Sequence, residues 1–562
     1  MELTGAKILL ECLQREGINT IFGYPGGAVI DIYDELSRSP IQHILVRHEQ
    51  AAVHAADGYA RATGKVGVAL VTSGPGATNA VTGIATASYD SIPMVIITGQ
   101  VHTMLIGNDA FQEVDIVGIT RSCTKHNYLV KDITKLASIL RQAFYLARTG
   151  RPGPVLVDLP KDVITGKTEF IWPDVVKMRS YMPTSAPNLV QLRRAASMLQ
   201  ESERPVILAG GGVIASNASE HLAQIAIQYN IPVISTLMGL GSFPSSHPLW
   251  HGMVGMHGRF VANTAVTETD LLIAIGTRFA DRVTGKISSF AKRAKIVHID
   301  VDPTSIRKNV EVDVPIVADC REALIGFGNV LNALSGSKEW ASRHVPWIEH
   351  LAEVNKANPL NYIESDEIKP QQVLETLCDI ANEDAIIATE VGQHQMWTTQ
   401  FYRFAKPRTF LSSGGLGTMG YGLPAAMGAQ VALPDRQVIL IAGDGSIQMN
   451  IQEMATLVYN RIPVKIIILN NQFLGMVRQW QELFYHRNYS QTRMEGQPDF
   501  VRLAEAYGAT GFRISRKEDL RETLKTALAT PGAVIVDVPV CREENVYPMV
   551  PAGAALDEML VV

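Results

Sequence analysis

Short runs of aliphatic and β-branched residues alternate with longer alanine-rich stretches along the whole chain. A short apolar run bounded by turn residues is typical of a buried strand, whereas a longer alanine-rich stretch is typical of a helix. This alternation predicts an α/β fold of doubly wound domains with mainly parallel sheets. The expected strands are residues 43–46, 66–71, 94–98, 155–158, 205–209, 232–236, 271–275, 295–299, 385–388, 438–441, 464–469 and 533–536.

Two stretches interrupt this alternation in a chain of 562 residues, which is too long for one hydrophobic core. Residues 172–188 contain three prolines and show no clear periodicity. Residues 335–370 begin with Ser335-Gly336-Ser337 and continue as a polar helical segment up to Pro370. If both stretches are linkers, the chain has three domains, at residues 1–172, 188–335 and 370–562.

Charge and hydropathy narrow the class of partner. Charged residues make up 19% of the chain, the net charge is −5, and no run of basic residues occurs. Proteins that follow a phosphate backbone normally carry such a run, so we expect no nucleic-acid partner. No apolar run approaches the roughly 18 residues that span a bilayer, so we expect no membrane association either.

The cysteines are scattered and form no closely spaced pair of the kind that binds zinc. They are Cys12, Cys123, Cys320, Cys378 and Cys541. Such a set indicates buried thiols in a reducing compartment. The first four residues include an acid and lack the basic-then-apolar pattern of a secretion signal. We therefore expect a cytoplasmic protein.

The most informative motif is Gly443-Asp444-Gly445-Ser446, which follows the apolar run 438–441. A second motif, Asn470-Asn471, follows the run 464–469, with 24 residues between Gly445 and Asn470. A strand–helix–strand unit of this length returns the second strand parallel to the first, so both motifs should emerge at one edge of a sheet. Ligands bind at that edge in open parallel sheets.

The residue types in the two motifs suit a magnesium ion. Mg²⁺ prefers hard oxygen ligands in octahedral geometry and usually keeps a phosphate in its coordination shell. Asp444 can supply a carboxylate oxygen and Asn471 an amide oxygen, with the backbone carbonyl of Phe473 as a third ligand.

The first motif also suits a diphosphate. Gly443 and Gly445 allow the backbone to approach it closely, and Ser446 is expected to begin a helix whose N-terminus favours an anion. Either motif alone has an ordinary explanation, a turn for the first and a helix cap for the second. The pair, at this spacing and after two strands, favours a metal–diphosphate site.

The two motifs together resemble the signature of the thiamine-diphosphate enzymes, which implies their three-domain architecture. In this family a glutamate at a strand end hydrogen-bonds the aminopyrimidine ring of the cofactor and relays the proton whose loss creates the C2 carbanion. Arg47-His48-Glu49-Gln50-Ala51-Ala52 follows a strand, opens a helix and matches that pattern, which makes Glu49 the catalytic candidate. Its ordinary explanation is a favourable interaction with the helix dipole. Glyoxylate carboligase lacks an acid at this position, so Glu49 argues against that relative.

Further cofactor contacts follow from the same resemblance. Within residues 390–397, Gln393 and His394 resemble the loop that contacts the diphosphate and the pyrimidine. Within residues 414–420, Met419 stands where the family places a bulky apolar side chain beneath the bent cofactor; simple core packing is its ordinary explanation. In this family the glutamate and the metal site come from different subunits, so at least a homodimer is implied.

Several segments resemble the bacterial biosynthetic large subunits of acetohydroxyacid synthase in particular. They are residues 22–28, 109–113, 150–154, 160–162 and 471–477 with Trp480. This resemblance implies that the chain decarboxylates pyruvate on thiamine diphosphate. It then joins the hydroxyethyl unit to pyruvate, giving 2-acetolactate, or to 2-oxobutyrate, giving 2-aceto-2-hydroxybutyrate, in branched-chain amino acid biosynthesis.

The same resemblance assigns roles around the reacting carbon. Gly27 would offer a backbone N–H, while Gln112 and Lys161 would line the mouth of the site. Arg282 would pair with the carboxylate of the second substrate and Trp480 would contact its alkyl tail. In the ordinary interpretation, Lys161 and Arg282 are solvated charges and Trp480 is a core aromatic.

The middle third resembles the FAD-binding domain of the family. Gly210-Gly211-Gly212 follows a strand but is not the dinucleotide-binding glycine pattern, so it is weak evidence alone. The residues that match the flavin contacts are Arg151, His257, Gly258, Gly276, Arg278, Asp300 and Asp319. Because the reaction is redox-neutral, the flavin would be structural.

Two positions depart from the family pattern. Ala280 stands where an aspartate usually repeats and His102 where plant-type sequences often carry proline, which puts inhibitor sensitivity in question.

Two other functions remain as alternatives. They are a pyruvate oxidase or 2-oxo acid decarboxylase on the same scaffold, and a non-catalytic regulatory subunit. The complete set of Glu49, Asp444 and Asn471 argues against the latter. We expect a small regulatory subunit as partner, while the choice between homodimer and homotetramer, valine feedback and acceptor preference stay open.

Overall fold

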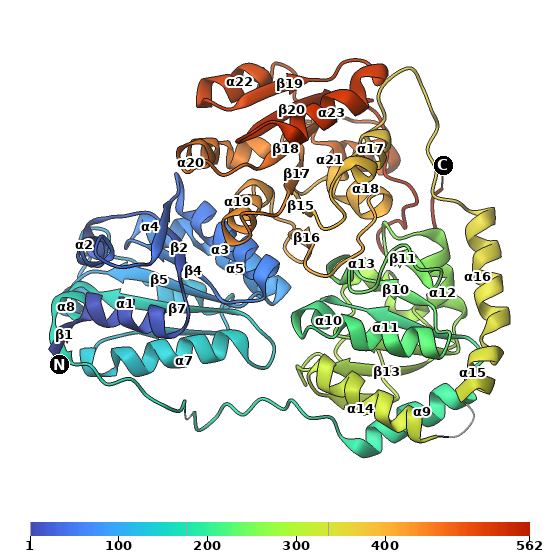
Figure 1. Ribbon diagram of the computed structural model, residues 1–562, viewed down its shortest axis with the longest axis horizontal. Helices are drawn as coiled ribbons and strands as arrows, with labels where there is room; N and C mark the ends of the chain where they lie inside the picture. Colours follow the sequence, from blue (N-terminus) through green and yellow to red (C-terminus); the bar gives the residue numbers. More distant parts are fainter. Residues whose placement is uncertain (1, 177, 335–336, 562) are drawn as a thin grey trace.

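The computed structural model describes residues 2–176, 178–334 and 337–561, and places them in three α/β domains (Figure 1). The N-terminal domain (blue) lies beside the central domain (green), and the C-terminal domain (orange and red) lies above both. Ser335 and Gly336, from the second expected linker, lie outside the described residues. The expected class of α/β domains with parallel sheets is confirmed.

The N-terminal domain is built on a six-stranded sheet with the order β3-β2-β4-β5-β7-β6, in which all neighbours are parallel. Its strands are β2 (Thr20–Gly23), β3 (Gln42–Leu45), β4 (Gly67–Val71), β5 (Met94–Gln100), β6 (His126–Leu129) and β7 (Pro154–Pro160). Its helices are α1 (Gly5–Arg15), α2 (Ile30–Leu36), α3 (Glu49–Thr63), α4 (Pro75–Asn79), α5 (Val81–Asp90), α6 (Ile116–Thr120), α7 (Leu136–Arg148) and α8 (Lys161–Thr165). A separate antiparallel pair joins β1 (Glu2–Thr4) to β8 (Lys167–Glu169).

The central domain has a six-stranded parallel sheet with the order β11-β10-β9-β12-β13-β14. Its strands are β9 (Pro205–Ala209), β10 (Val233–Ser235), β11 (Trp250–Met253), β12 (Leu271–Ile275), β13 (Lys295–Asp300) and β14 (Val314–Val317). Its helices are α9 (Leu189–Glu201), α10 (Gly211–Ala215), α11 (Ser219–Gln228), α12 (Phe260–Glu268), α13 (Asp281–Thr284) and α14 (Cys320–Ala333).

The C-terminal domain has a third six-stranded parallel sheet, with the order β16-β15-β17-β18-β20-β19. Its strands are β15 (Ile386–Thr389), β16 (Phe410–Leu411), β17 (Val438–Gly443), β18 (Lys465–Asn470), β19 (Thr510–Arg513) and β20 (Val534–Pro539). Its helices are α17 (Pro370–Ile380), α18 (Gln393–Phe401), α19 (Gly422–Ala432), α20 (Met454–Tyr459), α21 (Gly475–Phe484), α22 (Phe500–Tyr507) and α23 (Leu520–Ala529).

All twelve strands expected from the sequence are present in the three sheets, with small shifts at their ends. Six further strands of these sheets are not predicted by the apolar pattern: β2, β6, β11, β14, β16 and β19. Five of these six, all except β2, lie at sheet edges. An edge strand is paired on one side only and needs no continuous apolar run, so the apolar pattern that identifies interior strands is weak there.

Helices α3 and α19 join the N-terminal and C-terminal domains at the middle of the molecule (Figure 1). A Cβ atom at Gly58 would collide with the carbonyl oxygen of Ala425, and one at Gly428 with that of Ala55. Because both helices carry glycine and alanine at the crossing, their backbones approach closely and one hydrophobic core runs through both domains. This crossing sets how the strand ends of the two domains are placed.

The connections between domains differ in kind. Residues 172–176 and 178–188 form no helix or strand. In the second expected linker, α15 (Ser337–Arg343) and α16 (Val345–Ala357) contribute Trp340 and Trp347 to the hydrophobic cores of the central domain. None of the helices in the described part of the chain combines the length and hydropathy needed to cross a membrane.

The chain end returns from the C-terminal domain to the central one. After β20, the backbone N–H of Val550 donates to the carbonyl of Met256 at 2.7 Å, and that of Lys286 donates to the carbonyl of Ala554 at 2.9 Å. The segment between β20 and Val550 therefore runs from the strand ends of the C-terminal sheet to the central domain.

Candidate active site

The strand order of the C-terminal sheet locates a binding crevice. Strand β15 lies between β16 and β17, so the chain leaves β15 in one direction and later returns on its other side. In open α/β sheets, ligands bind outside the carboxyl ends of the strands where the order reverses in this way. Gln393 and His394 follow β15, and Asp444 follows β17, so these expected cofactor residues lie at the reversal point.

Asp444 presents one carboxylate oxygen with no protein partner. Its Oδ2 atom accepts a hydrogen bond from the side-chain amide of Gln497, whereas Oδ1 is buried and has no hydrogen-bond partner among the described residues. Burial raises the pKa of Asp444 to about 6. A buried, unpaired carboxylate oxygen is costly unless a ligand such as a cation neutralises it, so the residue fits the expected metal.

Asn471 follows the neighbouring strand, β18, and is also buried. Its Oδ1 atom accepts from the backbone N–H of Phe473 at 3.1 Å, and its Nδ2 atom donates to Oε1 of Gln393 at 3.2 Å. A carbonyl oxygen has two lone pairs, so Oδ1 retains one for a metal. In the described part of the chain, no group of three or more His, Cys, Asp or Glu side chains could hold a metal, so carboxylate, amide and backbone oxygens are the available donors.

The expected diphosphate and metal residues line one small cavity of about 90 Å³. They are Gln393, His394, Met419, Gly443, Asp444, Gly445, Ser446, Asn471 and Phe473. A Cβ atom at Gly443 would lie 2.7 Å from Nδ1 of His394, and one at Gly445 would lie 2.8 Å from Cδ2 of Leu474. At both positions a larger residue would force a neighbouring side chain to shift, and glycine leaves His394 and Leu474 in place.

The helix expected at Ser446 is present only as a short 3₁₀ helix, not as an α-helix. Two separate 3₁₀ turns, Ile447–Met449 and Ile451–Glu453, follow this residue, and α20 begins only at Met454. Asn450 separates the two turns and its side-chain amide donates to the carbonyl of Gly420 at 2.6 Å. This contact holds the backbone outside helical geometry and binds the segment to the loop after Met419.

Glu390 is a buried carboxylate whose role the sequence analysis did not recognise. Its oxygens accept from the backbone N–H groups of Gly420 at 2.7 Å and Leu423 at 3.1 Å. Burial raises its pKa to about 7. The side chain thereby fixes the turn after Met419 and the start of α19. Its position after a strand was the signal, but no nearby residue indicated the partner.

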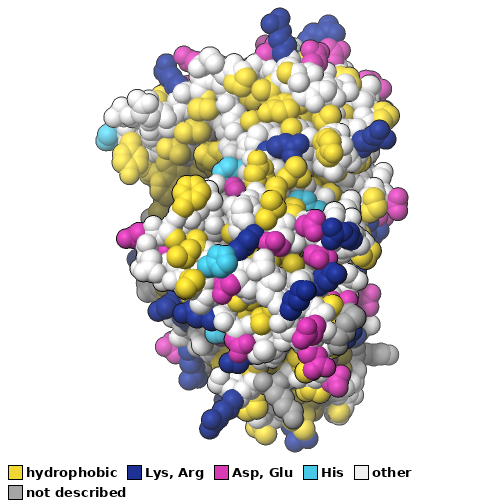
Figure 2. Space-filling view, turned by 90° about the vertical axis from the view of Figure 1, so that its left-hand side faces the viewer, with side chains coloured by type: hydrophobic (Ala, Val, Ile, Leu, Met, Phe, Trp, Pro, Cys, Tyr) yellow, Lys and Arg dark blue, Asp and Glu magenta, His cyan; other side chains and the backbone are white. Residues whose placement is uncertain are grey.

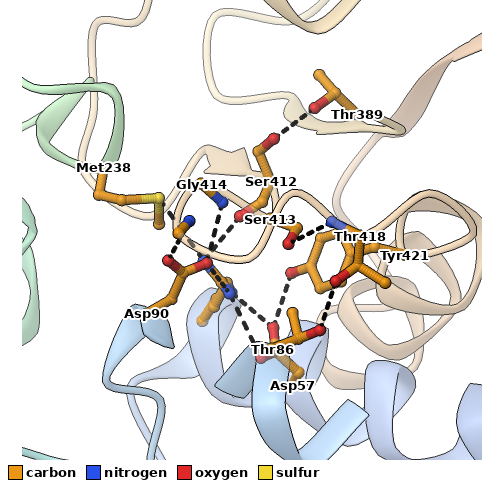
Figure 3. A network of polar contacts seen from close by, with 12 residues as sticks. Asp57, Thr86, Asp90, Met238, Thr389, Ser412, Ser413, Gly414, Thr418 and Tyr421 are labelled. Carbon is orange, nitrogen blue, oxygen red and sulfur yellow. Dashed lines mark hydrogen bonds and ion pairs between the residues drawn. The ribbon is translucent and has the colours of Figure 1, made fainter. Parts of the chain in front are cut away.

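The loop before Met419 is also held from the N-terminal domain (Figure 3). The guanidinium of Arg61 pairs with the buried carboxylates of Asp57 at 2.6 Å and Asp90 at 2.9 Å. Asp90 in turn accepts from the backbone N–H groups of residues 414 and 415. A buried charge cluster of this kind is costly to break, so it keeps the two domains in register beside the cavity.

Glu49 begins α3, as expected, and faces a space bounded by glycine. Its Oε2 atom accepts from Nδ2 of Asn79 at 3.0 Å. A Cβ atom at Gly76 would lie 3.2 Å from its Oε1 atom, so glycine keeps this oxygen accessible. The contact with Asn79 orients the carboxylate, and Oε1 has no hydrogen bond among the residues that the structure describes.

Glu453 lies at the boundary of the N-terminal and C-terminal domains and contacts the backbone two residues before Glu49. Its role was not predicted from the sequence. Its carboxylate accepts from the backbone N–H of Arg47 at 2.9 Å and from the hydroxyl of Thr456 at 2.7 Å. The side chain is buried, and burial raises its pKa to about 7. It therefore connects the C-terminal domain to the strand end that carries Glu49.

Three other expected catalytic residues lie near Glu49 on the N-terminal domain. The ammonium of Lys161 donates to the carbonyl of Gly27 at 3.0 Å and pairs with Asp31. Gln112 has φ 57° and packs its backbone against Gly74, which also has a positive φ. A Cβ atom at Gly27 would have no neighbour within 4 Å, so its backbone is open to a ligand.

A second cavity, of about 1570 Å³, extends between all three domains. It is lined by Arg151, His257, Gly276, Arg278, Asp300 and Asp319, whereas Gly258 is absent from its wall. Burial raises the pKa of Asp300 to about 6 and lowers that of His257 to about 4. Nδ1 of His257 is buried without a partner among the described residues. The volume of the cavity and this unpaired ring nitrogen fit an elongated ligand such as a flavin dinucleotide.

The order of the central sheet reverses between β9 and β12, at the wall of this cavity. A Cβ atom at Gly210, which follows β9, would collide with the carbonyl oxygen of Gly276, which follows β12. One at Gly212 would lie 2.6 Å from the Cα atom of Gly276. The glycine run therefore serves close packing at the reversal point, where dinucleotides bind in sheets of this order.

Arg282 and Trp480 line the larger cavity, whose wall also includes Met419. The guanidinium of Arg282 is exposed and pairs with Asp281 at 3.2 Å. Trp480 is half-buried and packs edge-to-face on Phe484, with ring centroids 5.6 Å apart. The indole is thus not a fully enclosed core aromatic, and both side chains are available to a ligand.

The expected site residues form two groups within the chain. Met419 borders both cavities and so connects the metal residues with Arg282 and Trp480. Among the residues described as lining these two cavities, Glu49, Gly27, Gln112 and Lys161 are absent. Neither of these two cavities therefore brings Glu49 together with the expected metal residues.

Comparison with family models identifies all three domains. Residues 3–119 match the thiamine pyrophosphate enzyme N-terminal TPP binding domain, and residues 192–326 match the central domain of the same enzymes. Residues 390–538 match the thiamine pyrophosphate enzyme C-terminal TPP binding domain.

Curated relatives match over nearly the whole chain. The acetolactate synthase isozyme 3 large subunit of Escherichia coli is 49% identical over 570 residues, covering 99% of this chain and 98% of the relative. The acetolactate synthase large subunit of Haemophilus influenzae is 48% identical, covering 100% of this chain and 98% of its own. That of Parasynechococcus marenigrum is 50% identical, covering 99% and 91% respectively.

Proposed function

Since the chain belongs to the family of acetolactate synthase large subunits among the thiamine-diphosphate enzymes, we propose how its residues divide the work of that reaction. The chain is a carboligase that decarboxylates pyruvate on thiamine diphosphate and joins the two-carbon unit to a second 2-oxo acid. With pyruvate as acceptor the product is 2-acetolactate, and with 2-oxobutyrate it is 2-aceto-2-hydroxybutyrate.

The observation that carries the residue assignment is the unpaired Oδ1 atom of Asp444, next to Asn471 at the reversal point of the C-terminal sheet. Asp444, Asn471 and the carbonyl of Phe473 would hold Mg²⁺. Gly443, Gly445, Ser446, Gln393 and His394 would surround the diphosphate. Titrating thiamine diphosphate into the protein at a series of Mg²⁺ concentrations tests the site, because affinity should rise with Mg²⁺ until the metal site is saturated.

When bound, thiamine diphosphate would supply a nucleophilic C2 carbon for the reaction with pyruvate. Glu49 would hold and move the proton that activates it, through Oε1, the oxygen that Asn79 does not engage. Met419 would give the cofactor apolar support. Gly27 would offer a backbone N–H, and Gln112 and Lys161 would line the mouth of the site.

The acceptor binds toward the larger cavity. The exposed guanidinium of Arg282 pairs with the carboxylate of the second 2-oxo acid, and the indole of Trp480 contacts its alkyl tail. Both residues border the cavity beside Met419, which supports this assignment.

The larger cavity would hold FAD as a structural group, with Arg151, His257, Gly276, Arg278, Asp300 and Asp319 at its wall. Gly258 would act through the backbone beside His257. The reaction is redox-neutral, so the flavin has no electrons to transfer. Turnover without oxygen should therefore give acetolactate with no net flavin reduction, measured by absorbance; stoichiometric reduction or obligatory oxygen uptake would contradict a structural role and favour an oxidase.

A second copy of the chain would complete the site. Residues near Gly27 and Gln112 are exposed and apolar, among them Ile30, Met104 and Phe111. Figure 2 shows hydrophobic side chains gathered on one face of the molecule, a feature of surfaces that bind another protein. We therefore infer a homodimer or homotetramer, in which Glu49 of one chain serves the metal residues of another. Sedimentation of the purified chain measures this state.

The partner and compartment follow from family membership and thiol chemistry. Relatives carry the name large subunit, so we propose that a small regulatory subunit binds this chain. All five cysteines are free, which suits a reducing cytoplasm.

We place domain limits near residues 1–172, 188–335 and 370–562, with α15 and α16 packed on the central domain.

The runner-up function, a pyruvate oxidase or 2-oxo acid decarboxylase, is set aside by the names of the relatives. Product analysis with pyruvate and 2-oxobutyrate separates the three activities. Acetohydroxy acids are expected. Acetyl phosphate, or acetate with peroxide, would indicate an oxidase, and acetaldehyde a decarboxylase.

A further inference from the structure

Gln479, on α21, is a buried side chain that lines neither of the two cavities. Both the oxygen and the nitrogen of its amide form hydrogen bonds. Its Oε1 atom accepts from the backbone N–H of Val546 at 2.8 Å and from Nε2 of Gln393 at 2.8 Å. Its Nε2 atom donates to the carbonyl of Val546 at 3.1 Å. Backbone donors and acceptors cannot exchange roles, so Val546 permits only this orientation of the Gln479 amide.

That orientation in turn decides the amide of Gln393. The Nε2 atom of Gln393 donates to Oε1 of Gln479 and to the carbonyl of Glu544 at 3.0 Å. Both partners are acceptors, so a flipped Gln393 amide would lose both bonds. Its Oε1 atom is therefore directed to Nδ2 of Asn471, at 3.2 Å.

The last step of the relay, together with the backbone N–H of Phe473, determines which atom Asn471 offers to a metal. With Nδ2 engaged by Gln393, Asn471 turns Oδ1 away from that partner and leaves it for coordination. Mg²⁺ requires oxygen ligands, and an amide presented the other way would offer N–H groups to the cation. The orientation of the Asn471 amide thus decides whether this side chain coordinates the cation or repels it.

Packing leaves the relay little freedom to rearrange. A Cβ atom at Gly475 would collide with Oε1 of Gln393 and lie 2.7 Å from Nδ2 of Asn471, so this pair rests directly on a bare backbone. The segment that anchors Gln479 is itself held by the buried guanidinium of Arg478, which donates to the carbonyl of Glu544 at 2.9 Å.

We propose that Gln479 is a positioning residue for magnesium. It transmits the fixed backbone polarity of Val546 through Gln393 to Asn471, so that the segment after β20 sets the metal affinity. The inference rests on the proposed function, in which Asn471 is a metal ligand. It adds a residue that contacts neither metal nor cofactor.

The test is Gln479→Met in the full-length chain, which keeps an unbranched side chain but removes every hydrogen bond of the amide. Loss of an outer partner of a metal ligand typically weakens metal affinity about 10- to 100-fold. We expect the Mg²⁺ concentration for half-maximal binding of thiamine diphosphate, read from protein fluorescence, to rise in this range. Turnover at saturating Mg²⁺ should fall much less, because excess metal compensates for weaker binding.

The matched control is Gln430→Met on α19. Gln430 is also buried, and its amide donates to the carbonyls of Leu433, Pro434 and Arg436, at the other end of the domain. This variant should lower the melting temperature without changing the Mg²⁺ requirement. An equal shift in both variants, or a shift in neither, overturns the relay.

Two further variants keep the test decisive if Gln479→Met folds poorly. Gln479→Glu retains acceptors for Gln393 and Val546 and loses only the donor, so its Mg²⁺ requirement should lie between wild type and Gln479→Met. A requirement equal to or above that of Gln479→Met contradicts the relay. With Asn471→Ala, unchanged Mg²⁺ dependence removes the ligand assignment itself, whereas weakened binding there with wild-type behaviour in Gln479→Glu and Gln479→Met removes only the relay.

Discussion

The N-terminal and C-terminal domains arrange their six-stranded sheets in one order but place different chemistry at the strand ends. In each, the second strand lies at an edge beside the first, and the third, fourth, sixth and fifth follow. In the C-terminal domain Asp444 and Asn471 directly follow the third and fourth strands; in the N-terminal domain the second strand ends before Glu49. In the proposed function, one topology therefore carries the metal and diphosphate residues in one domain, a holding role, and the proton-moving Glu49 in the other.

The central sheet has a different strand order and a different ligand site. Its first three strands run outward in sequence and the last three run the other way from the first, the order found in dinucleotide-binding domains. Its reversal point is closed by Gly210 against Gly276 and borders the larger cavity. Strand order thus decides where ligands gather, while the residues after each strand decide which ligand.

Asp444→Ala tests the holding role and should have the largest effect. Loss of the charged metal ligand should abolish Mg²⁺-dependent binding of thiamine diphosphate, measured by titration, with the fold retained by circular dichroism. Asp435→Ala, at an exposed position of the same domain, is the control and should bind normally. Unchanged cofactor affinity in Asp444→Ala would remove the metal assignment.

Glu49→Gln tests the proton-moving role. General acid–base participation is typically worth about 10²–10⁴ in rate, so turnover and exchange of the C2 proton should slow by that order. The affinity for thiamine diphosphate should change only modestly, because the proposed metal and diphosphate contacts of the C-terminal domain supply most of the binding energy. Asn79→Ala, which frees the carboxylate without removing it, should show a smaller loss in the same exchange rate. Exchange at the wild-type rate in Glu49→Gln would falsify the assignment.

Glu453→Gln tests the connection between the two domains. The folded-state pKa of Glu453, about 7, lies above the ordinary 4.5 because the group is buried. Its contribution to stability is therefore complete below pH 4.5 and is lost as pH rises through 7. Over that interval the free energy of unfolding of wild type should fall relative to the variant, by at most about 3 kcal/mol. Parallel denaturant curves for both proteins at each pH would contradict this.

Trp480→Leu sharpens the comparison within the C-terminal domain by separating acceptor choice from cofactor binding. Contact with one extra methylene gives a discrimination of about 1–3 kcal/mol, or roughly 10- to 200-fold, in favour of 2-oxobutyrate. The variant should bring this preference toward unity, because its shorter side chain leaves a gap beside the terminal methyl. Competition between the two acceptors at fixed pyruvate measures the product ratio. Phe484→Leu controls for packing, and an unchanged ratio in Trp480→Leu would leave the indole a packing residue.

Local sequence patterns were sufficient for the interior of the fold. Interior strands of a parallel sheet are buried on both faces and read as continuous apolar runs, so all were found except β2. The spacing of the motifs at Asp444 and Asn471 was also sufficient to bring them to one cavity, because the carboxyl ends of parallel strands share an edge.

Other features depend on partners that are distant in the chain. The bond from Arg47 to Glu453 spans 406 positions, and that from Asn471 to Gln393 spans 78. Nothing near Glu453 or Gln479 in the sequence distinguishes them from ordinary polar residues. The helix expected at Ser446 is a short 3₁₀ helix, and Asn450 after it bonds to the carbonyl of Gly420, 30 positions away. Buried polar groups must find hydrogen-bond partners, but which groups meet is decided by the packing of whole domains. The sequence alone therefore indicates the residues proposed to react. The residues that orient them can be identified only from the packing of the three domains.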